Sequence, residues 1–380
     1  MVVWLVGAAT LVFVQRAQAE SPRRFVEARH GLGELSYVGE IPILVVEGTH
    51  QEIGEQIGHL AIRPAATLFD DIDAFVASLG WKAAFPLLVK TGERLVERLD
   101  EGYRVEFAAA ATAGHVPRDL LAFANTVGDF LNIGGCSTLV VEPSRSVHGG
   151  AIFGRNFDWP PFGVLPEFAM VTVVRQPGKR SYAQIGYAPM LGVTSGMNDA
   201  GLCLAMLEVS AAADGSPAFD PVGVPASFAF RRVLEECSTI DEAAQLLGEL
   251  KRTTMFNLAV CDKHCGAVFE ATTQNFNVRR ASSGLCMCTN HFRTNGLARS
   301  TECNRFARLR QYEDVDRDLS LADVAAAMHA VNQGRNTLQT MIFEPSTLTL
   351  HLAIGHGPVS AKPLQAIELG HYLSADLATE

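Results

Sequence analysis

The stretch LNIGGCSTLVV, residues 131–141, decides the fold. In it a lone cysteine follows two glycines and precedes a run of strand-forming residues. Gly134 and Gly135 permit a close-packed backbone that other residues resist. The run that begins at Ser137 predicts a β-strand, which would fix the position of Cys136. A free cysteine is usually an inert, buried side chain and needs no such setting. A cysteine that becomes a new chain terminus does need a close-packed backbone before it and a fixed strand after it.

The stretch FGRNFDW, residues 153–159, predicts a second strand that pairs with the first one. The turn-forming residues PSRSVHG between the two strands indicate an antiparallel hairpin. That pairing would bring Arg155 and Asp158 within reach of Cys136. An arginine would stabilise the cysteine thiolate, and a carboxylate could hold an ammonium group.

Cleavage of the bond between Gly135 and Cys136 would give the cysteine a free α-amino group, whose ordinary pKa is about 7.7–8.0. Such an amine is a suitable general base near neutral pH and is tethered to its own nucleophile. The sequence holds no G-x-S-x-G, H-E-x-x-H, G-x-x-x-x-G-K-[ST] or G-x-G-x-x-G motif. A cysteine with its own amine needs no separate histidine, and no cofactor is predicted.

Composition and charge narrow the class of protein. The chain has 380 residues, of which 48% are hydrophobic and 19% charged, and this balance is typical of a globular protein. Its net charge of −10 argues against nucleic acid as a partner, because phosphate binding needs clustered lysine and arginine. We expect a small-molecule substrate, and association between identical copies of the chain is left open.

The first nineteen residues predict an export signal. Residues 2–14 are almost entirely apolar but too few to span a bilayer, and Ala17 and Ala19 occupy the small-residue positions that a signal peptidase reads. A charged segment before the apolar run is missing, so a buried strand or short helix remains the alternative. The expectation is a periplasmic or secreted protein cleaved near Ala19.

The pattern along the chain changes character at Cys136. Residues 49–130 indicate helices, beginning with a capping box formed by Thr49 and Glu52. The sequence after Cys136 indicates hairpins interleaved with helices, one near 225–236 and one over 239–249 with Ser238 and Asp241 as its capping box. An α+β arrangement in which helices cover the sheets follows. The predicted organisation is a signal peptide at 1–19, a largely helical segment at 20–135 and a second segment at 136–380.

All eight cysteines lie at or after position 136. CDKHC at 261–265 and CMC at 286–288 could supply thiolates to zinc, but their spacing is poor for a tetrahedral site. Core packing or disulfide bonding is the better interpretation, and no metal site is predicted.

An ordered set of motifs resembles the N-terminal-nucleophile (Ntn) cysteine hydrolases of the penicillin (isopenicillin N) acyltransferase type, related to choloylglycine hydrolases and acid ceramidase. The resemblance covers most of residues 40–370. The motifs that carry it are GTHQEIGEQIG, the junction around Cys136, GRNFDW, GMNDAGLCLAMLEV, TNHF at 289–292, STECNRFARL at 300–309 and the closing hairpin. It implies a four-layer αββα sandwich whose inactive precursor cleaves itself before Cys136, giving a light and a heavy chain that stay associated.

The resemblance also implies a role for each residue of the site. Cys136 matches the nucleophile, Arg155 the residue beside the thiolate and Asp158 the carboxylate that contacts the α-amino group. Asn290 matches an asparagine whose side-chain N–H faces the oxyanion, and Arg305 a second arginine of the active site. The alternatives are a strand-end cap for Asn290 and a solvated helix residue for Arg305.

One departure concerns Glu208, which stands where choloylglycine hydrolases have an asparagine. An ionised carboxylate cannot donate a hydrogen bond to an oxyanion, which speaks against a bile-salt hydrolase. Glu208 would either place a negative charge near the pocket or face solvent. Asn198 is expected to serve the turn NDAG and not the chemistry.

The resulting prediction is an exported, self-processing amidohydrolase or acyltransferase that acts on N-acyl amides through an acyl thioester at Cys136. Linear or lipid-like amides are the first class to test. One alternative is an exported, non-catalytic binding protein with the same fold. Another is a precursor that needs a partner or acid pH for its cleavage.

Overall fold

The computed structural model describes residues 23–70, 76–77, 80–130 and 133–374. The predicted export signal at 1–19 lies outside these residues. No helix within the described ranges is both long and apolar enough to cross a membrane.

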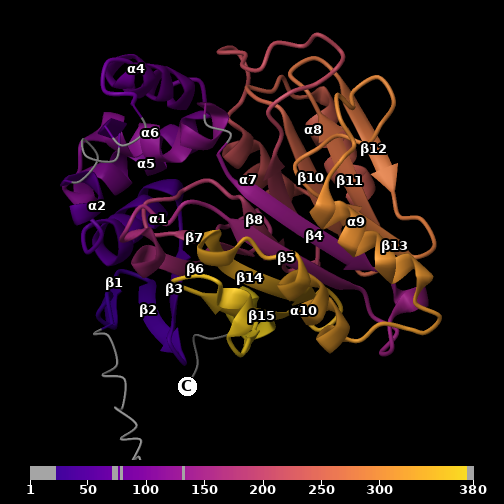
Figure 1. Ribbon diagram of the computed structural model, residues 1–380. Helices are drawn as coiled ribbons and strands as arrows, with labels where there is room; N and C mark the ends of the chain where they lie inside the picture. The colour runs from indigo at the N-terminus through magenta and orange to yellow at the C-terminus, as the bar shows by residue number, and fades with distance from the viewer. Residues whose placement is uncertain (1–22, 71–75, 78–79, 131–132, 375–380) are drawn as a thin grey trace, which may run out of the picture.

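Two sheets form the centre of the molecule (Figure 1). The larger sheet has ten strands in the order β1 (Ala28–His30), β2 (Gly33–Val38), β3 (Ile41–Glu47), β6 (Ala169–Arg175), β7 (Tyr182–Tyr187), β8 (Ser195–Asn198), β9 (Cys203–Glu208), β10 (Phe256–Cys261), β11 (Gly266–Ala271) and β12 (Phe276–Arg280). The smaller sheet has six strands in the order β13 (Leu285–Cys288), β4 (Gly135–Val141), β5 (Ile152–Asp158), β14 (Thr337–Glu344), β15 (Thr349–Ile354) and β16 (Gln365–Glu368).

Helices lie on the two outer faces. The larger group is α1 (His50–Ile57) with its π-helical continuation (Gly58–Ile62), α2 (Thr67–Asp70), α4 (Phe85–Val96), α5 (Glu101–Gly114), α6 (Arg118–Phe130), α7 (Ala226–Glu236) and α8 (Ile240–Glu249). The second group is α9 (Asn304–Arg310) and α10 (Leu321–Ala330), and α11 (Leu369–Leu373) follows the last strand.

The alternation of side chains along β4 shows how the layers form, because successive residues of a strand face opposite sides. Cys136 and Val140 belong to the core between the two sheets. Leu139 and Val141 face the other way and pack with α9 and α10. The opposite face of the larger sheet packs against the larger helical group. The order helix, sheet, sheet, helix is the four-layer αββα sandwich predicted from the sequence.

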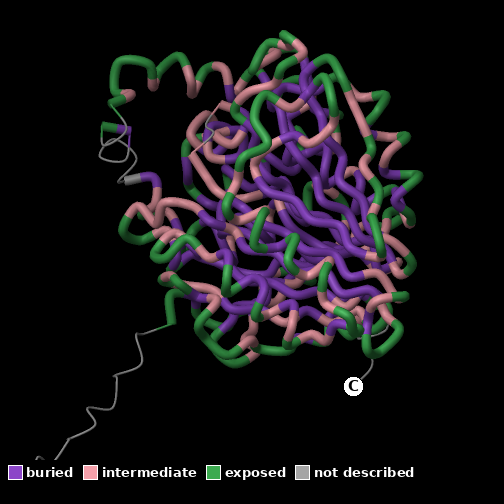
Figure 2. Tube along the Cα trace, turned by 45° about the vertical axis from the view of Figure 1, so that its right-hand side comes forward, coloured by how far each residue is buried: buried purple, intermediate pink, exposed green. Residues whose placement is uncertain are grey.

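Burial follows this layering. Figure 2 shows buried chain concentrated in the central strands, with exposed segments at the periphery. Strands β7, β9, β10 and β11 consist entirely of buried residues, as expected for strands covered on both faces. Strands β4 and β5 are themselves almost wholly buried, so their side chains are packed on both faces.

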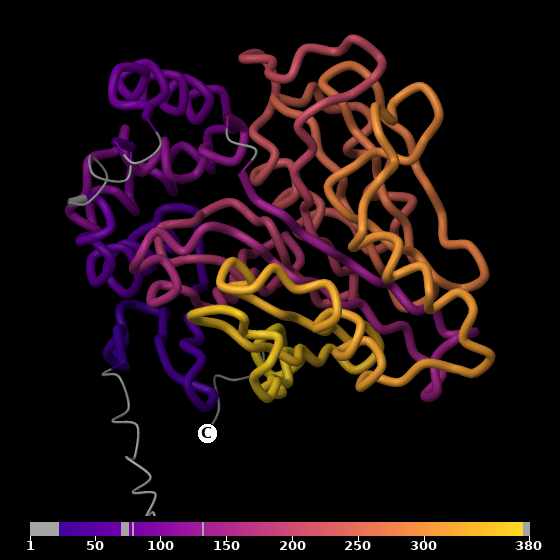
Figure 3. Tube along the Cα trace, viewed as in Figure 1, coloured from indigo at the N-terminus to yellow at the C-terminus, as the bar shows by residue number. Residues whose placement is uncertain are grey.

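Residues 20–135 are predicted to be largely helical, and their helices begin at His50, after a first part that is not helical. Residues 28–47 form three strands, and β3 pairs with β6 in parallel register, Ile43 opposite Val171. The run IPILVVE is short and almost wholly buried, so it shows no clear alternation that would have marked it as a strand. Figure 3 shows this N-terminal part of the chain beside the C-terminal strands. Because β3 pairs with β6, residues on both sides of Cys136 build the larger sheet.

Two local predictions meet different outcomes. The capping box of Thr49 and Glu52 is confirmed at the start of α1. The cap predicted at Ser238 is wrong by one residue, because α8 begins after Thr239, whose side chain accepts from the Glu242 main-chain N–H. The overlapping pairs Ser238/Asp241 and Thr239/Glu242 have the same spacing, and the structure uses the second pair.

A buried ionic cluster joins helices from both sides of Cys136. Arg231 of α7 donates to Glu106 of α5 through Nη2 at 2.8 Å and to Glu235 through Nε at 2.7 Å. His50 Nδ1 lies 2.8 Å from Glu106, and the hydroxyl of Tyr103 donates to Glu235. The side chains of Arg231, Glu106 and Glu235 are each only 1% exposed. The cluster therefore fastens α1 and α5 to the segment after Cys136.

Candidate active site

The pairing of β4 with β5 places Arg155 beside Cys136. Cys136 lies opposite Phe157 and Thr138 lies opposite Arg155, so Arg155 is the diagonal neighbour of Cys136 on the same face. Its Nη2 lies 3.5 Å from the Cys136 Sγ, within hydrogen-bond range for sulfur. The hairpin predicted from the two sequence stretches is confirmed.

Arg155 is fully buried, and within the described residues it forms no ion pair with a carboxylate. Its Nη1 donates to the main-chain carbonyl of Thr194 at 2.7 Å, and its Nε has no partner in the described part of the chain. A buried charge is costly unless it is paired. Burial raises the pKa of the Cys136 thiol, and the positive charge of Arg155 opposes that rise. The thiolate of Cys136 is the anion that would complete this pair.

Asp158 is completely buried opposite Gly135 in the hairpin. Its oxygens accept hydrogen bonds from Thr337 Oγ1 at 2.5 Å and from Gln333 Nε2 at 3.1 Å. Burial raises the pKa of Asp158 to about 6, and these two hydrogen bonds oppose the rise. Gln333 and Thr337 were not predicted as site residues, because the sequence gives no signal that links them to a carboxylate 175 and 179 positions away.

Asn290 and Arg305 hold the main chain on the cysteine side of the predicted cleavage bond. The Cys136 main-chain N–H donates to Asn290 Oδ1 at 2.7 Å, and Arg305 donates to the Cys136 carbonyl and, at 2.9 Å, to Ser137 Oγ. The solvated alternative for Arg305 is therefore wrong. Asn290 lies in the site, but its amide nitrogen donates to the main-chain carbonyl of Glu208 at 2.9 Å. In the uncleaved chain its oxygen, not the predicted N–H, faces Cys136.

Glu208 points into the site, and the solvent-facing alternative is wrong. Its Oε2 accepts a hydrogen bond from the Gly134 main-chain N–H at 2.9 Å, and the residue is 8% exposed. Burial raises the pKa of Glu208 to about 8, which makes the carboxyl group largely neutral below that pH. Asn198 serves its turn as expected, because its Oδ1 accepts from the main-chain N–H groups of Ala200 and Leu202.

Side chains at the positions of the two glycines before Cys136 would crowd neighbouring groups of the site. A Cβ at Gly135 would lie 1.9 Å from Gln333 Nε2, and one at Gly134 would lie 2.7 Å from the Trp159 ring. Residues with side chains at these positions would displace either the amide that holds Asp158 or the indole beside it. The lone cysteine follows two glycines because the main chain runs here through a tightly filled space.

We expect Gly135→Ala to slow cleavage of the chain by about tenfold or more, since the added methyl group must push Gln333 away from Asp158 (a distortion of about 1 Å at a site can cost about a hundredfold). The measurement is the time course of fragment appearance after synthesis. Gly150→Ala is the matched control, because a Cβ there would meet only Ser346, at 3.5 Å. Equal cleavage rates in the two variants would contradict the packing argument.

The raised pKa of Glu208 predicts how stability varies with pH. The pKa of its carboxyl is about 8 in the folded chain and 4.5 ordinarily, so the folded protein holds this proton and the unfolded chain releases it between these values. The contribution of Glu208 to the free energy of unfolding is therefore full below pH 4.5 and is lost as the pH rises toward 8. Glu208→Gln, tested by thermal melts in the uncleavable Cys136→Ala background, should reduce the fall in stability between pH 5 and 8 by at least about 1 kcal/mol. An unchanged pH profile would show that Glu208 is not protonated in the folded protein.

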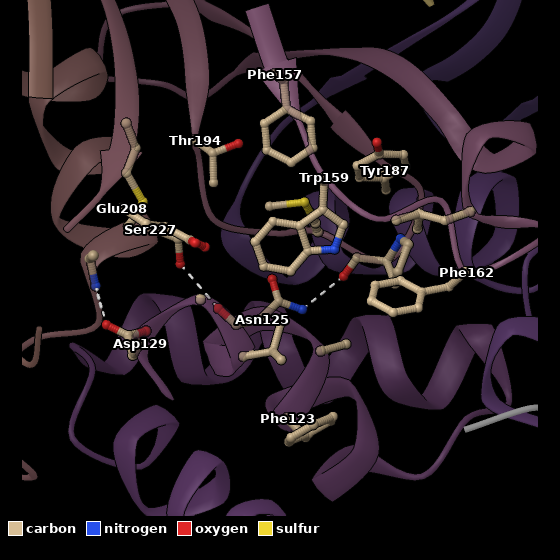
Figure 4. A pocket seen from close by; sticks show the side chains of 18 of the residues that line it. Phe123, Asn125, Asp129, Phe157, Trp159, Phe162, Tyr187, Thr194, Glu208 and Ser227 are labelled. Carbon is tan, nitrogen blue, oxygen red and sulfur yellow. Dashed lines mark hydrogen bonds between the residues drawn. The ribbon is translucent and has the colours of Figure 1, made fainter. Parts of the chain in front are cut away.

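A largely apolar cavity of about 240 Å³ opens beside Cys136. Figure 4 shows aromatic rings around it, with Asp129, Glu208 and Ser227 on one side. Its apolar lining includes Leu68, Phe69, Phe123, Phe157, Trp159 and Met206. Helix α6 and the strands around Cys136 thus form a cavity suited to an apolar acyl group.

The eight cysteines are free thiols, and no group of three potential metal ligands occurs among the described residues. Cys286 and Cys288 lie on one face of β13 in the core between the sheets, as the core-packing interpretation predicts. Within CDKHC, Cys261 ends β10 and residues 262–265 form the turn to β11.

The αββα sandwich, with a glycine–cysteine junction at the start of an inner strand, defines the class of N-terminal-nucleophile hydrolases and acyltransferases. The sequence also matches a family model described as acyl-coenzyme A:6-aminopenicillanic acid acyl-transferase over residues 146–357. This match spans more than half of the chain, and the chain therefore belongs to that family. The resemblance and the enzyme class predicted from the sequence are confirmed.

The solved structures that the chain matches share little sequence with it. An N-acylethanolamine-hydrolyzing acid amidase ortholog from Caenorhabditis elegans is 18% identical, with a TM-score of 0.44 over 55% of this chain and 93% of that one. A variant of conjugated bile acid hydrolase from Clostridium perfringens is 15% identical, with a TM-score of 0.47 over 62% and 93%. Penicillin V acylase from Agrobacterium tumefaciens is 15% identical, with a TM-score of 0.41 over 58% and 83%. Comparison with curated protein sequences finds no significant match.

Proposed function

We propose that the protein is a self-processing cysteine amidohydrolase or acyltransferase that acts on N-acyl amides. The observation that carries the proposal is the pairing of the Cys136 Sγ with Arg155, a buried guanidinium whose other partner is a main-chain carbonyl. An inert core cysteine does not need a buried cation at its sulfur, whereas a nucleophilic thiolate does.

Self-processing would begin with attack of the Cys136 sulfur on the carbonyl carbon of Gly135. The carbon–nitrogen bond then breaks, the nitrogen takes up a proton, and a thioester joins Gly135 to the sulfur. Water hydrolyses the thioester to give a carboxylate at Gly135, a free thiol and a free α-amine at Cys136. Contacts at Gly134, Cys136 and Ser137 support this step, because they hold both sides of the bond in place.

In the processed enzyme the new α-amine would serve as general base for its own thiol. The cleaved bond's nitrogen already lies 2.7 Å from Asn290 Oδ1, so that oxygen would accept a proton of the new amine. Asp158, across the hairpin from Gly135, supplies a negative charge that favours the ammonium form. The thiolate would attack the substrate amide, release its amine and hold the acyl group as a thioester until water or another amine takes it.

The separation into light and heavy chains at 135/136 and the export of the protein are part of the same proposal. The sheet and the ionic cluster shared by the two segments support their continued association after cleavage.

The proposal is tested with a series of N-acyl amides of increasing acyl chain length, using mass spectrometry to detect acylation of the heavy chain. The apolar cavity predicts that kcat/KM rises about fourfold for each added methylene, from about 0.8 kcal/mol per buried CH₂, until the cavity is full. Acylation must appear on the peptide that begins at Cys136. Processed protein that never carries an acyl group with any member of the series would favour a non-catalytic binding protein.

A further inference from the structure

Asp129 is a buried carboxylate in the wall of the cavity that also contains Cys136. It lies near the end of α6 and is 3% exposed. Figure 4 shows it on the side of the cavity where Ser227 and Glu208 also lie. No step proposed above uses this group.

Only one of the two oxygens of Asp129 has a structural role. Oδ1 accepts hydrogen bonds from the Ala226 main-chain N–H at 3.0 Å and from the Thr253 hydroxyl, which fastens α6 to the start of α7. Oδ2 has no hydrogen-bond partner among the residues that the structure describes. Nor does the carboxylate form an ion pair with any of them. Its charge is therefore left partly unsatisfied at the cavity.

Among the residues that the structure describes, no cation forms an ion pair with Asp129. Burial raises its pKa to about 6, and the two hydrogen bonds to Oδ1 oppose the rise, with no charged side chain contributing. Glu208, by contrast, is influenced by the charge of Arg155. Above pH 6 the cavity thus has a cationic residue at Cys136 and an isolated anion at Asp129. An uncompensated anion among apolar groups such as Phe123, Val127 and Trp159 favours a ligand that brings a positive charge.

We propose that Asp129 binds a protonated amino group of the substrate. Preferred substrates would be N-acyl amides in which an aliphatic segment separates an ammonium group from the scissile carbonyl. Arg155 repels a cation from the reactive end, so the two charges together orient such a substrate with its carbonyl at Cys136. The ammonium group can belong to the acyl part or to the amine part of the amide. The reaction itself rests on the function proposed above, whereas binding of an ammonium group does not.

The first experiment measures ligand binding by the purified protein at pH 7.5, above the pKa of Asp129. Thermal melts are recorded with heptylamine and with heptan-1-ol, two probes with the same apolar chain. We expect heptylamine to bind about tenfold more tightly, since a hydrogen bond to a charged group contributes more than one between neutral groups. Equal binding of the two probes, or binding of neither, would overturn the proposal without the use of any variant.

The second experiment compares kcat/KM for matched pairs of amides. In one arm 6-aminohexanoyl and heptanoyl amides of the same amine place the charge in the acyl part. In the other arm the acetamides of 1,6-diaminohexane and heptylamine place it in the amine part. We expect at least one arm to show about a tenfold preference for the charged member, and Asp129→Asn to abolish that preference.

Asp119→Asn is the matched control, since Asp119 lies in the first turn of the same helix and its carboxylate accepts from the Leu120 main-chain N–H. This variant should retain the preference for the charged amide. A preference that survives Asp129→Asn, or the absence of a preference in both arms, would overturn the proposal. Processed protein that binds heptylamine through Asp129 but turns over no amide would contradict the proposed function and leave this inference standing.

Discussion

A Cys136→Ala variant should remain a single full-length chain, while the parent protein separates into two chains, the second beginning Cys-Ser-Thr-Leu. The reason is that both reactions proposed for the site form a bond to the same sulfur. The Sγ that contacts Arg155 would attack Gly135 during processing and the substrate carbonyl during turnover. We expect amidase activity to fall by a factor on the order of 10⁶, the loss found when a catalytic nucleophile is removed.

Intact mass measurement and N-terminal sequencing of the purified protein check this result, at neutral and at acid pH. Cys265→Ala is a suitable control, because Cys265 lies in the turn between β10 and β11 and is also a free thiol. It should be cleaved as the parent protein is. A parent protein that stays intact under both conditions would rule out self-processing and favour the binding-protein alternative.

The second large effect concerns stability. Arg231→Met should lower the free energy of unfolding by about 3–5 kcal/mol, since it leaves the carboxylates of Glu106 and Glu235 buried without their cation. The measurement is urea unfolding in the uncleavable Cys136→Ala background, where one chain contains the whole cluster. In processed protein the same substitution should promote release of the light chain, which gel filtration detects.

Arg232→Met is the matched control on the next residue of the same helix. Arg232 pairs with Glu236 at 3.2 Å at the surface, with 27% of its side chain exposed. A surface pair of this kind contributes only about 0.2–1 kcal/mol. Similar losses in the two variants would mean that the buried cluster does not hold the two segments together.

The part of the site that could be predicted from sequence is the part made by neighbouring strands. Arg155 reaches Cys136 because a short hairpin fixes their register, and a hairpin follows from local turn and strand signals. Asn290 and Arg305 lie more than 150 positions from Cys136, so only the family resemblance pointed to them. Even then the resemblance did not give the orientation of the Asn290 amide, which depends on the donors and acceptors around it.

The fold, like the site, has parts that local sequence signals predict and parts that depend on distant residues. Helices α1 and α10 begin with capping boxes, which are local sequence signals. Helix α5 gives only a weak helical periodicity, because its run of alanines is buried on several sides. Strand β3 joins β6 across more than 120 residues, a parallel pairing that no local pattern specifies.

That parallel pairing would make the two products of the proposed cleavage dependent on each other. A light-chain fragment made alone would expose the edge of β3 that β6 normally occupies, and such an edge invites aggregation. The heavy-chain fragment would likewise lack three strands of its larger sheet. If the two halves were expressed from separate genes, they would therefore have to be synthesised at the same time. Each half could then associate with the other before its open sheet edge aggregates with further copies of itself.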